Sequence, residues 1–221
     1  VGGQPTRNWL SGTFAGAEAL SGETMTDTIL KHNDTCYACS VRCKRVVETE
    51  YKGAKVDPLY GGPEYETLST IGSYCCVGDL HAVSLANQIC AQNGLDTIST
   101  GATIAFAMEC FEQGLLSTEE TGGLALRFGD AGLVLELIEK IAARDGFGDL
   151  LAEGTRRLAA RIGRGAERLA VEVKGQELPY HDPRIQHGLG LGYAVSYTGA
   201  DHCHSAFDRN WEQEPGLEEM K

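Results

Sequence analysis

The sequence lacks any apolar run close to the roughly 18 residues that a membrane-spanning helix needs. It is also short of positive charge, because 19 Lys and Arg stand against 31 Asp and Glu and the net charge is −12. Nucleic acid and anionic membranes repel such a chain, so neither is expected as a partner. The first residues, Val1 to Pro5, contain no initiator methionine and no signal-peptide pattern. We therefore expect a cytoplasmic protein of which this sequence is a part.

Cysteine is abundant by contrast, with eight residues, and three of them are bunched at Cys36, Cys39 and Cys43. A disulfide framework fits poorly, since a chain of this length can bury a core without cross-links. The Cys-x-x-Cys pair can bring two thiolates to one metal centre, and the third cysteine follows four residues later. With one more ligand they suit a [4Fe–4S] cluster, which the cationic neighbours Arg42 and Lys44 favour. A zinc site with a distant fourth ligand and three unligated thiols are the alternatives.

The pattern along the chain predicts a mainly α fold. The first 30 or so residues read as irregular with one short helix, and residues 53–66 read as a loop. Five helices are expected from caps and repeating apolar faces: one from Asp79 to about Cys90, one through residues 104–115, one after the capping box Ser117/Glu120, one after Asp130 and one from Asp149 to about Gly163. Val171 and Val173 suggest a short strand. The Gly-rich stretch 188–199 is expected to form a site rather than core.

Two segments combine carboxylates with glycine. The loop at residues 61–67 carries Glu64 and Glu66, which suit acid/base chemistry or a plain solvated loop. The segment 94–101 lies between two predicted helices and contains Asp96. Its carboxylate could accept paired N–H bonds such as those at the edge of a pterin, or it could simply cap the next helix.

Histidines gather near the end of the sequence. Four of the six lie between residues 177 and 205: His181, His187, His202 and His204. Together with nearby aspartates they predict a site that handles protons or holds a metal. A surface loop with scattered histidines is the alternative.

Taken together, these segments resemble the tungsten aldehyde:ferredoxin oxidoreductase family, and the match runs in order through almost the whole chain. The motifs that carry it are Pro5-Thr6-Arg7-Asn8, the cysteine trio, Gly62-Pro63-Glu64-Tyr65-Glu66-Thr67, the segment 94–101, Glu177-Leu178-Pro179 with Asp182-Pro183-Arg184, and Gly199-Ala200-Asp201-His202. The resemblance implies a helical middle domain over residues 1–165, with the Cys motif and one pterin motif. It also implies the truncated start of a C-terminal domain over residues 166–221.

The resemblance further implies the family's chemistry. Two pyranopterins would hold tungsten or molybdenum, with Mg2+ joining their phosphates, and a [4Fe–4S] cluster would pass electrons to ferredoxin. An aldehyde and water would give a carboxylic acid. The residues implied are Glu64 and His202 as catalytic groups, with Glu66 as the alternative carboxylate; Gly94, Leu95 and Asp96 for a pterin; and Cys36, Cys39 and Cys43 for the cluster.

The sequence departs from the family pattern at two positions. Ala91 stands where the pterin motif begins with Asp, and His181 stands where relatives have Tyr. We also expect a preceding domain, a second pterin motif and the fourth cluster cysteine to lie outside this sequence. The chain alone should therefore be inactive and prone to self-association. The competing hypotheses are a catalytic subunit of benzoyl-coenzyme A reductase and a non-catalytic zinc-binding helical domain.

Overall fold

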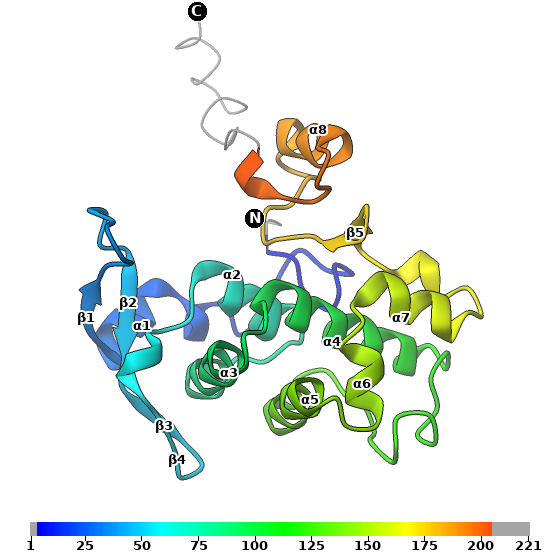
Figure 1. Cartoon of the computed structure of the whole chain (residues 1–221), viewed down its shortest axis with the longest axis horizontal. Coiled ribbons are helices and arrows are strands. Elements are labelled where there is room, and N and C mark those ends of the chain that lie inside the picture. The colour runs from blue at the N-terminus through cyan, green and yellow to red at the C-terminus, as the bar shows by residue number, and fades with distance from the viewer. Residues whose placement is uncertain (1–3, 205–221) are drawn as a thin grey trace, which may run out of the picture.

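The computed structural model describes residues 4–204, and the mainly α prediction is confirmed (Figure 1). Its helices are α1 (Gly22–Thr28), α2 (Tyr65–Thr67), α3 (Leu80–Asn93), α4 (Thr97–Glu112), α5 (Ala131–Ala143), α6 (Phe147–Leu151), α7 (Thr155–Ile162) and α8 (His187–Val195). A π-helical segment, Leu68–Ser73, continues α2. The strands form three antiparallel hairpins, which are β1 (Leu30–Asp34) with β2 (Lys44–Val47), β3 (Thr49–Tyr51) with β4 (Ala54–Val56), and β5 (Glu172–Val173) with β6 (Gln176–Glu177).

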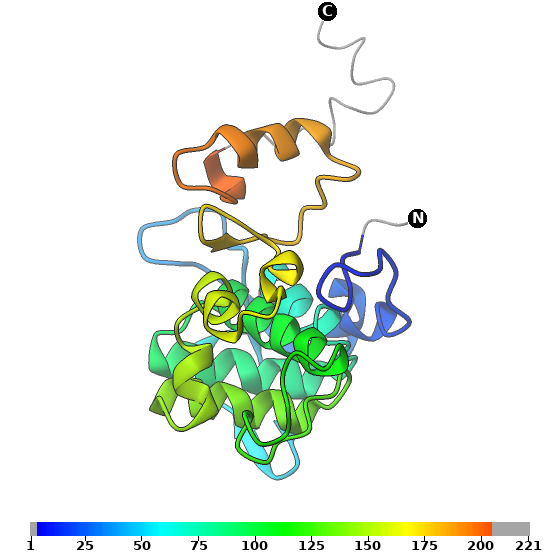
Figure 2. The same ribbon diagram turned by 90° about the vertical axis from the view of Figure 1, so that its right-hand side faces the viewer.

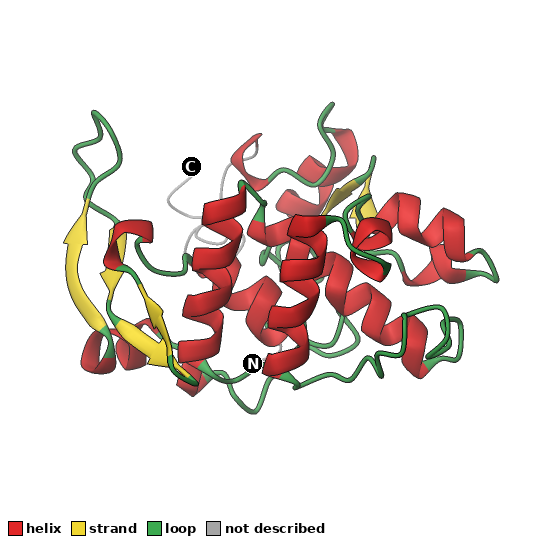
Figure 3. Ribbon diagram, turned by 60° about the horizontal axis from the view of Figure 1, so that its bottom comes forward, coloured by secondary structure: helices red, strands yellow, loops and turns green. Residues whose placement is uncertain are grey.

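Helix α4 forms the centre of the main core. All its residues from Thr100 to Cys110 are buried, and α2, α5, α6 and α7 contact it within the group of helices in Figure 3. It also crosses the π-helical segment at backbone distance, since a Cβ on Gly101 would lie 2.4 Å from the backbone of Thr70. This close crossing fixes α2 and the π-helical segment against the core. No helix in the described part of the chain is long and apolar enough to cross a lipid bilayer.

Two of the predicted helix starts are confirmed in detail. Asp79 Oδ1 accepts hydrogen bonds from the His81 and Ala82 N–H groups at the start of α3, and this helix ends at Gly94. Asp130 accepts the Leu133 N–H at the start of α5. Each carboxylate satisfies N–H groups that the first helical turn leaves without partners.

The helix predicted after Ser117 is wrong. Both bonds of the capping box form, since the Ser117 N–H donates to Glu120 Oε2 over 2.8 Å and the Glu120 N–H donates to Ser117 Oγ over 3.3 Å. The chain then turns at Gly122 and Gly123, whose φ angles are 70° and 95°. Residues in this left-handed region cannot continue a right-handed helix, so the box closes a series of turns.

The helix predicted from Asp149 to Gly163 is wrong in its start and its continuity. Asp149 lies inside α6, which Gly146 precedes as the N-cap residue. Gly154, with a φ of 82°, then separates α6 from α7. The Thr155 N–H at the start of α7 donates over 2.8 Å to Oε1 of Glu177, a buried carboxylate on β6. A residue more than twenty positions later therefore supplies the cap.

The regions predicted as irregular are only partly so. The short helix in the first 30 residues is confirmed as α1. The loop predicted at residues 53–66 is wrong in part, because it contains β4 and a 3-10 turn at Pro58–Tyr60. Most of the Gly-rich stretch at 188–199 forms α8. The short strand predicted at Val171 and Val173 is confirmed as β5, which pairs with β6.

A second, smaller apolar cluster lies under α8. Leu178, Leu189, Tyr193 and Ala200 form it, and Trp9 packs against it from the N-terminal loop. Figure 2 shows this C-terminal part stacked on the helical body. The chain between β6 and α8 therefore runs between two cores.

Candidate active site

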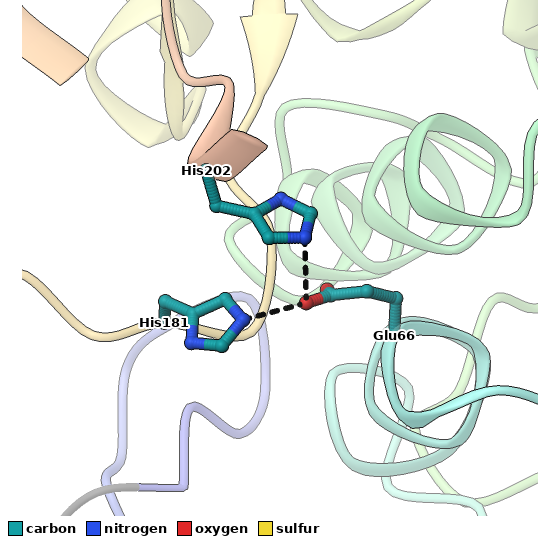
Figure 4. Close-up of side chains that lie close together, drawn as sticks. All are labelled: Glu66, His181 and His202. Atoms are coloured by element: carbon teal, nitrogen blue, oxygen red, sulfur yellow. Dashed lines mark ion pairs between the residues drawn. The ribbon is translucent and has the colours of Figure 1, made fainter. Parts of the chain in front are cut away.

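Glu66 on α2 lies at the junction of these two cores. Its Oε2 accepts a hydrogen bond from the Tyr180 N–H over 2.6 Å. Its Oε1 lies 3.1 Å from His181 Nε2 and 3.8 Å from His202 Nε2 (Figure 4). His181 follows β6, and His202 begins η5, a 3-10 turn at His202–His204. Segments far apart in the sequence thus bring one carboxylate and two imidazoles together, which we call the Glu66–His181–His202 cluster.

The cluster is largely shielded from solvent. Its side chains are 15%, 15% and 20% exposed for Glu66, His181 and His202. Glu66 Oε1 is buried and accepts no well-aligned hydrogen bond from the described residues, so ring nitrogens are its polar neighbours. The three donor atoms all lie within 4.8 Å of one another. The 3.1 Å distance between Glu66 Oε1 and His181 Nε2 is short enough for direct proton exchange, and one water molecule can bridge the longer distance to His202.

Aromatic rings form the surroundings of the cluster. The His181 and His202 rings stack with centroids 4.9 Å apart and planes at 28°. Tyr65 lies beside them, 5.7 Å from the His181 ring and 4.9 Å from the Tyr180 ring between centroids. Burial, with a smaller contribution from the charge of Glu66, holds the pKa of Tyr74 well above its usual range. A phenol in this setting stays neutral and leaves the proton chemistry to Glu66 and the histidines.

An ion pair between the buried Asp182 and the half-exposed Arg184 fixes the segment that carries His181. Asp182 is completely buried, and the Nε and an Nη of Arg184 donate to its two carboxylate oxygens over 2.7 to 3.0 Å. Arg184 also donates to the Trp9 carbonyl over 3.0 Å. The Asp182-Pro183-Arg184 motif contributes to the family resemblance. Nothing in the sequence predicted that it anchors the neighbouring His181.

The structure brings Glu66, not Glu64, to His202. Glu64 is exposed at the N-cap position of α2, where its side chain makes no capping bond. Glu66 is two residues further on, and its carboxylate is turned toward the two histidines (Figure 4). Residues two apart on a helix point in different directions, so one of the pair had to face away. The catalytic carboxylate therefore stays a prediction, with Glu66 as its better candidate.

Asp96 caps α4, which was the simpler of its two interpretations. Its side chain accepts the Ser99 N–H over 2.8 Å and the Ile98 N–H over 3.4 Å. It also lines a cavity of about 360 Å³ together with Gly94 and Leu95. The cavity reaches Arg144 at the end of α5, where Asp149 and Glu153 hold the guanidinium. The predicted pterin residues thus share one hollow, and pterin binding stays a prediction.

The three clustered cysteines lie in the loop between β1 and β2, away from the cluster (Figure 1). Cys36 and Cys43 are exposed and Cys39 is half-buried. The Cys39 N–H donates to the Cys36 carbonyl over 3.1 Å, and Ala38 and Arg42 adopt left-handed φ angles of 58° and 56°. These turns fold the loop back on itself. An accessible, cation-flanked loop suits thiolate ligands, whose role stays a prediction.

Two further histidines lie outside the cluster. His187 begins α8 and is exposed. His204 Nε2 is 3.0 Å from Asp201 Oδ2. Of the four C-terminal histidines, the structure therefore joins two to a buried carboxylate.

The comparisons with known proteins identify the family of the chain. A model of the aldehyde ferredoxin oxidoreductase family, domains 2 and 3, matches residues 1–221. The chain is 42% identical to the tungsten-containing aldehyde ferredoxin oxidoreductase of Pyrococcus furiosus over 199 residues, and 43% identical to that of Pyrococcus abyssi over 201 residues. Each alignment covers 90% of this chain and 32% of the relative.

More distant relatives have other named activities. One is the WOR-like subunit of an aliphatic sulfonate oxidoreductase from Pyrococcus furiosus, 29% identical over 92% of this chain and 33% of its own length. A solved structure, the active site complex BamBC of benzoyl coenzyme A reductase with 1,5-dienoyl-CoA, aligns with a TM-score of 0.61 and 27% identity. That alignment covers 78% of this chain and 26% of the other.

All of these relatives are oxidoreductases or reductases. The chain belongs to the aldehyde ferredoxin oxidoreductase family, in the part that forms domains 2 and 3. It spans about a third of the length of the curated relatives it matches. The family resemblance found in the sequence is confirmed.

Proposed function

We propose that this chain belongs to an enzyme that oxidises an aldehyde to a carboxylic acid at a tungsten or molybdenum bis-pyranopterin centre. The observation that carries the proposal is the shielded Glu66–His181–His202 cluster, in a chain of this family. The overall change, aldehyde plus water to acid plus two electrons and two protons, requires a group that removes protons near the reacting carbon. A carboxylate within reach of imidazole is the side-chain arrangement suited to that task.

Within this proposal, Glu66 Oε1 takes a proton from the water that adds to the aldehyde, and His202 Nε2 receives it from Glu66. The metal centre, when bound, accepts the two electrons. The Tyr180 N–H keeps Oε2 engaged, so Oε1 is the atom left to act as the base. The aromatic rings around the cluster limit the entry of bulk water, which preserves the directed transfer.

The cofactor residues follow the same proposal. Asp96 and the loop Gly94–Leu95 border a cavity with room for part of a flat ring system, and a carboxylate suits the N–H edge of a pterin. Cys36, Cys39 and Cys43 would hold a [4Fe–4S] cluster that passes electrons to ferredoxin. A fourth ligand would come from elsewhere in the whole protein, as would the ligands of a Mg2+ that joins the pterin phosphates.

We also propose the division into a middle domain at residues 1–165 and the start of a third domain at residues 166–221. The second apolar cluster beneath α8 supports a separate core in the later part. The whole enzyme would act in the cytoplasm. The present chain, expressed alone, would carry neither a complete cluster nor the metal centre, since each needs ligands from the rest of the protein.

The test is expression of the whole protein in an anaerobic host supplied with tungstate. Purified enzyme should contain tungsten, iron and sulfide, and should reduce ferredoxin when given aldehydes of different chain length. Tungsten-loaded enzyme that leaves every aldehyde unchanged, but reduces benzoyl-coenzyme A with a low-potential donor, would replace the proposal by the reductase function. A protein with zinc and no tungsten would contradict both.

A further inference from the structure

We propose that His181 is a second proton acceptor for Glu66 and a positioning residue for His202, so that protons leave the site through two imidazoles. This rests on the proposed function, because it assigns a route to the protons which that reaction releases.

The distances favour His181 as the nearer partner of the carboxylate. Its Nε2 lies 3.1 Å from Glu66 Oε1, against 3.8 Å for His202 Nε2. The first distance is within hydrogen-bond reach and the second is beyond it. Since Oε1 is buried, a proton held there has to pass to one of the two rings before it can reach solvent.

His181 is also fixed more firmly than a loop residue usually is. The hydrogen bond from Tyr180 to Glu66 precedes it, and the ion pair of the buried Asp182 with Arg184 follows it. Its own N–H donates to the Pro179 carbonyl over 2.7 Å. A ring held on both sides can serve as a platform for another ring, and His202 stacks on it at 4.9 Å. His181 therefore sets the position of His202 as well as contacting Glu66.

The proton transfer from Glu66 to His181 needs no further reactant. The O–H bond of protonated Glu66 breaks as an N–H bond forms at His181 Nε2, and the imidazolium then gives its proton to water. Among the described residues, the titratable groups around the cluster are Glu66 on α2, His202 in η5, Asp201 before it, the Cys203 thiol at 4.0 Å from His202 Nε2, the Asp182–Arg184 pair and the phenols of Tyr65, Tyr180 and Tyr193. Asp182 is paired with Arg184, while Glu66 Oε1 lies 3.1 Å from His181 Nε2.

The test compares His181→Tyr and His181→Gly with the parent in the whole, metal-loaded enzyme. His181→Tyr keeps an aromatic ring but removes the basic nitrogen, and His187→Gln is the matched control because His187 is an exposed histidine outside the cluster. A positioned acid/base group contributes about 10²–10⁴ in rate, so with His202 still present we expect a fall in kcat toward the lower end of that range. KM for the aldehyde and the tungsten content should stay as in the parent.

Two readouts separate proton transfer from a purely structural role. Added imidazole should restore part of kcat in His181→Gly, and more of it at higher pH, where the free imidazole is neutral. The midpoint potential of the tungsten centre should fall as pH rises in the parent, because reduction of the metal is coupled to protonation of the Glu66–His181–His202 cluster. That slope should be shallower in His181→Tyr and unchanged in His187→Gln.

Several results would overturn the inference. Equal kcat, or equal potential slopes, in parent and His181→Tyr would remove His181 from the proton route, as would a His181→Gly enzyme that imidazole does not restore. Stoichiometric zinc that is bound in the parent and lost in His181→Tyr would mean that a metal ion, not a proton, occupies the three atoms. Loaded parent enzyme that oxidises no aldehyde would overturn the proposed function alone, since the potential slopes still decide the role of His181 without substrate.

Discussion

The backbone N–H of Tyr180 donates a hydrogen bond to Glu66 Oε2 over 2.6 Å, across 114 positions of sequence. The bond holds one oxygen of the carboxylate, so the other points at the histidines. It also ties the segment carrying His181 to α2. The orientation of the candidate base is therefore set by a main-chain group, which side-chain substitution at position 180 does not remove.

Substitution of the two neighbouring glutamates should separate their roles. Glu66→Gln keeps the size of the side chain but removes its basicity, so kcat for aldehyde oxidation should fall by about 10²–10⁴. Glu64→Gln is the matched control, because Glu64 is exposed and is the N-cap residue of the same short helix. Steady-state kinetics with measured tungsten content tests this. A larger loss in Glu64→Gln than in Glu66→Gln would reverse the assignment.

His202→Ala should lower kcat while the enzyme keeps its tungsten. The imidazole lies beside Glu66 Oε1 and accepts its proton in the proposed route, and about 10²–10⁴ in rate depends on such a group. His204→Ala, two residues away and paired with Asp201, is the control. Turnover equal to the parent throughout the pH range would exclude His202 from proton transfer.

Asp96→Ala should reduce pterin content beyond what a lost helix cap explains. Asp96 and Asp130 are both N-cap aspartates, of α4 and α5, so each Ala variant loses about 0.5–2 kcal/mol of stability. Asp96 alone of the two lines the cavity with Gly94 and Leu95. The measurement is the amount of pterin released from each purified variant. The melting temperatures of the two variants are measured as well, to show that their losses of stability match. Equal pterin in both variants would leave Asp96 as a cap only.

Cys39→Ser in the whole protein should remove the iron–sulfur absorbance and electron transfer to ferredoxin. Each thiolate of the trio would bind one iron, so the loss of Cys39 would leave one iron without its protein ligand. Cys203→Ser is the control, because Cys203 is also exposed but belongs to another element. Iron and sulfide analysis reports the result. Unchanged iron in Cys39→Ser, or a lost cluster in Cys203→Ser, would require a different ligand set.

Alkylation should divide the thiols of metal-free protein into two groups. Burial raises the pKa of Cys90 and of Cys110 to about 12, and only the thiolate is nucleophilic. At pH 8 about one such thiol in 10⁴ is ionised. Cys36 and Cys43 are exposed in their loop. Mass spectrometry after brief iodoacetamide treatment should find these two modified and the buried pair intact, with the difference shrinking as pH rises.

Much of the helical architecture could be predicted from local signals. The caps at Asp79 and Asp130 and the apolar face of α5 depend on neighbouring residues, and both helices form where the sequence places them. The predictions of a helix after Ser117 and of a single helix from Asp149 were wrong for the same kind of reason. A capping pattern states that a helix is possible, while glycines such as Gly122 and Gly154 stop it.

The candidate site was predictable in its members but not in its geometry. His202 and the pair Glu64/Glu66 stood out as chemistry-bearing residues, yet their spacing could not tell which glutamate faces the histidine. His181 was noticed as a departure from a pattern, and its contact with Glu66 forms only when the segment that follows β6 lies against α2. Contacts between segments so far apart depend on how the helices and loops pack together, and a single sequence does not reveal that packing.

The cap of α7 comes from Glu177, which receives the Thr155 N–H and also lies 3.4 Å from Thr103 Oγ1 on α4. The acceptor is thus on the far side of the domain division proposed at residue 165. A recombination event that exchanged the later segment for an unrelated one would remove the hydrogen-bond acceptor of the Thr155 N–H. The first turn of α7 would then have a buried N–H group without a partner. Such chimeras would be selected against, so the two domains should be inherited as one unit wherever this carboxylate is kept.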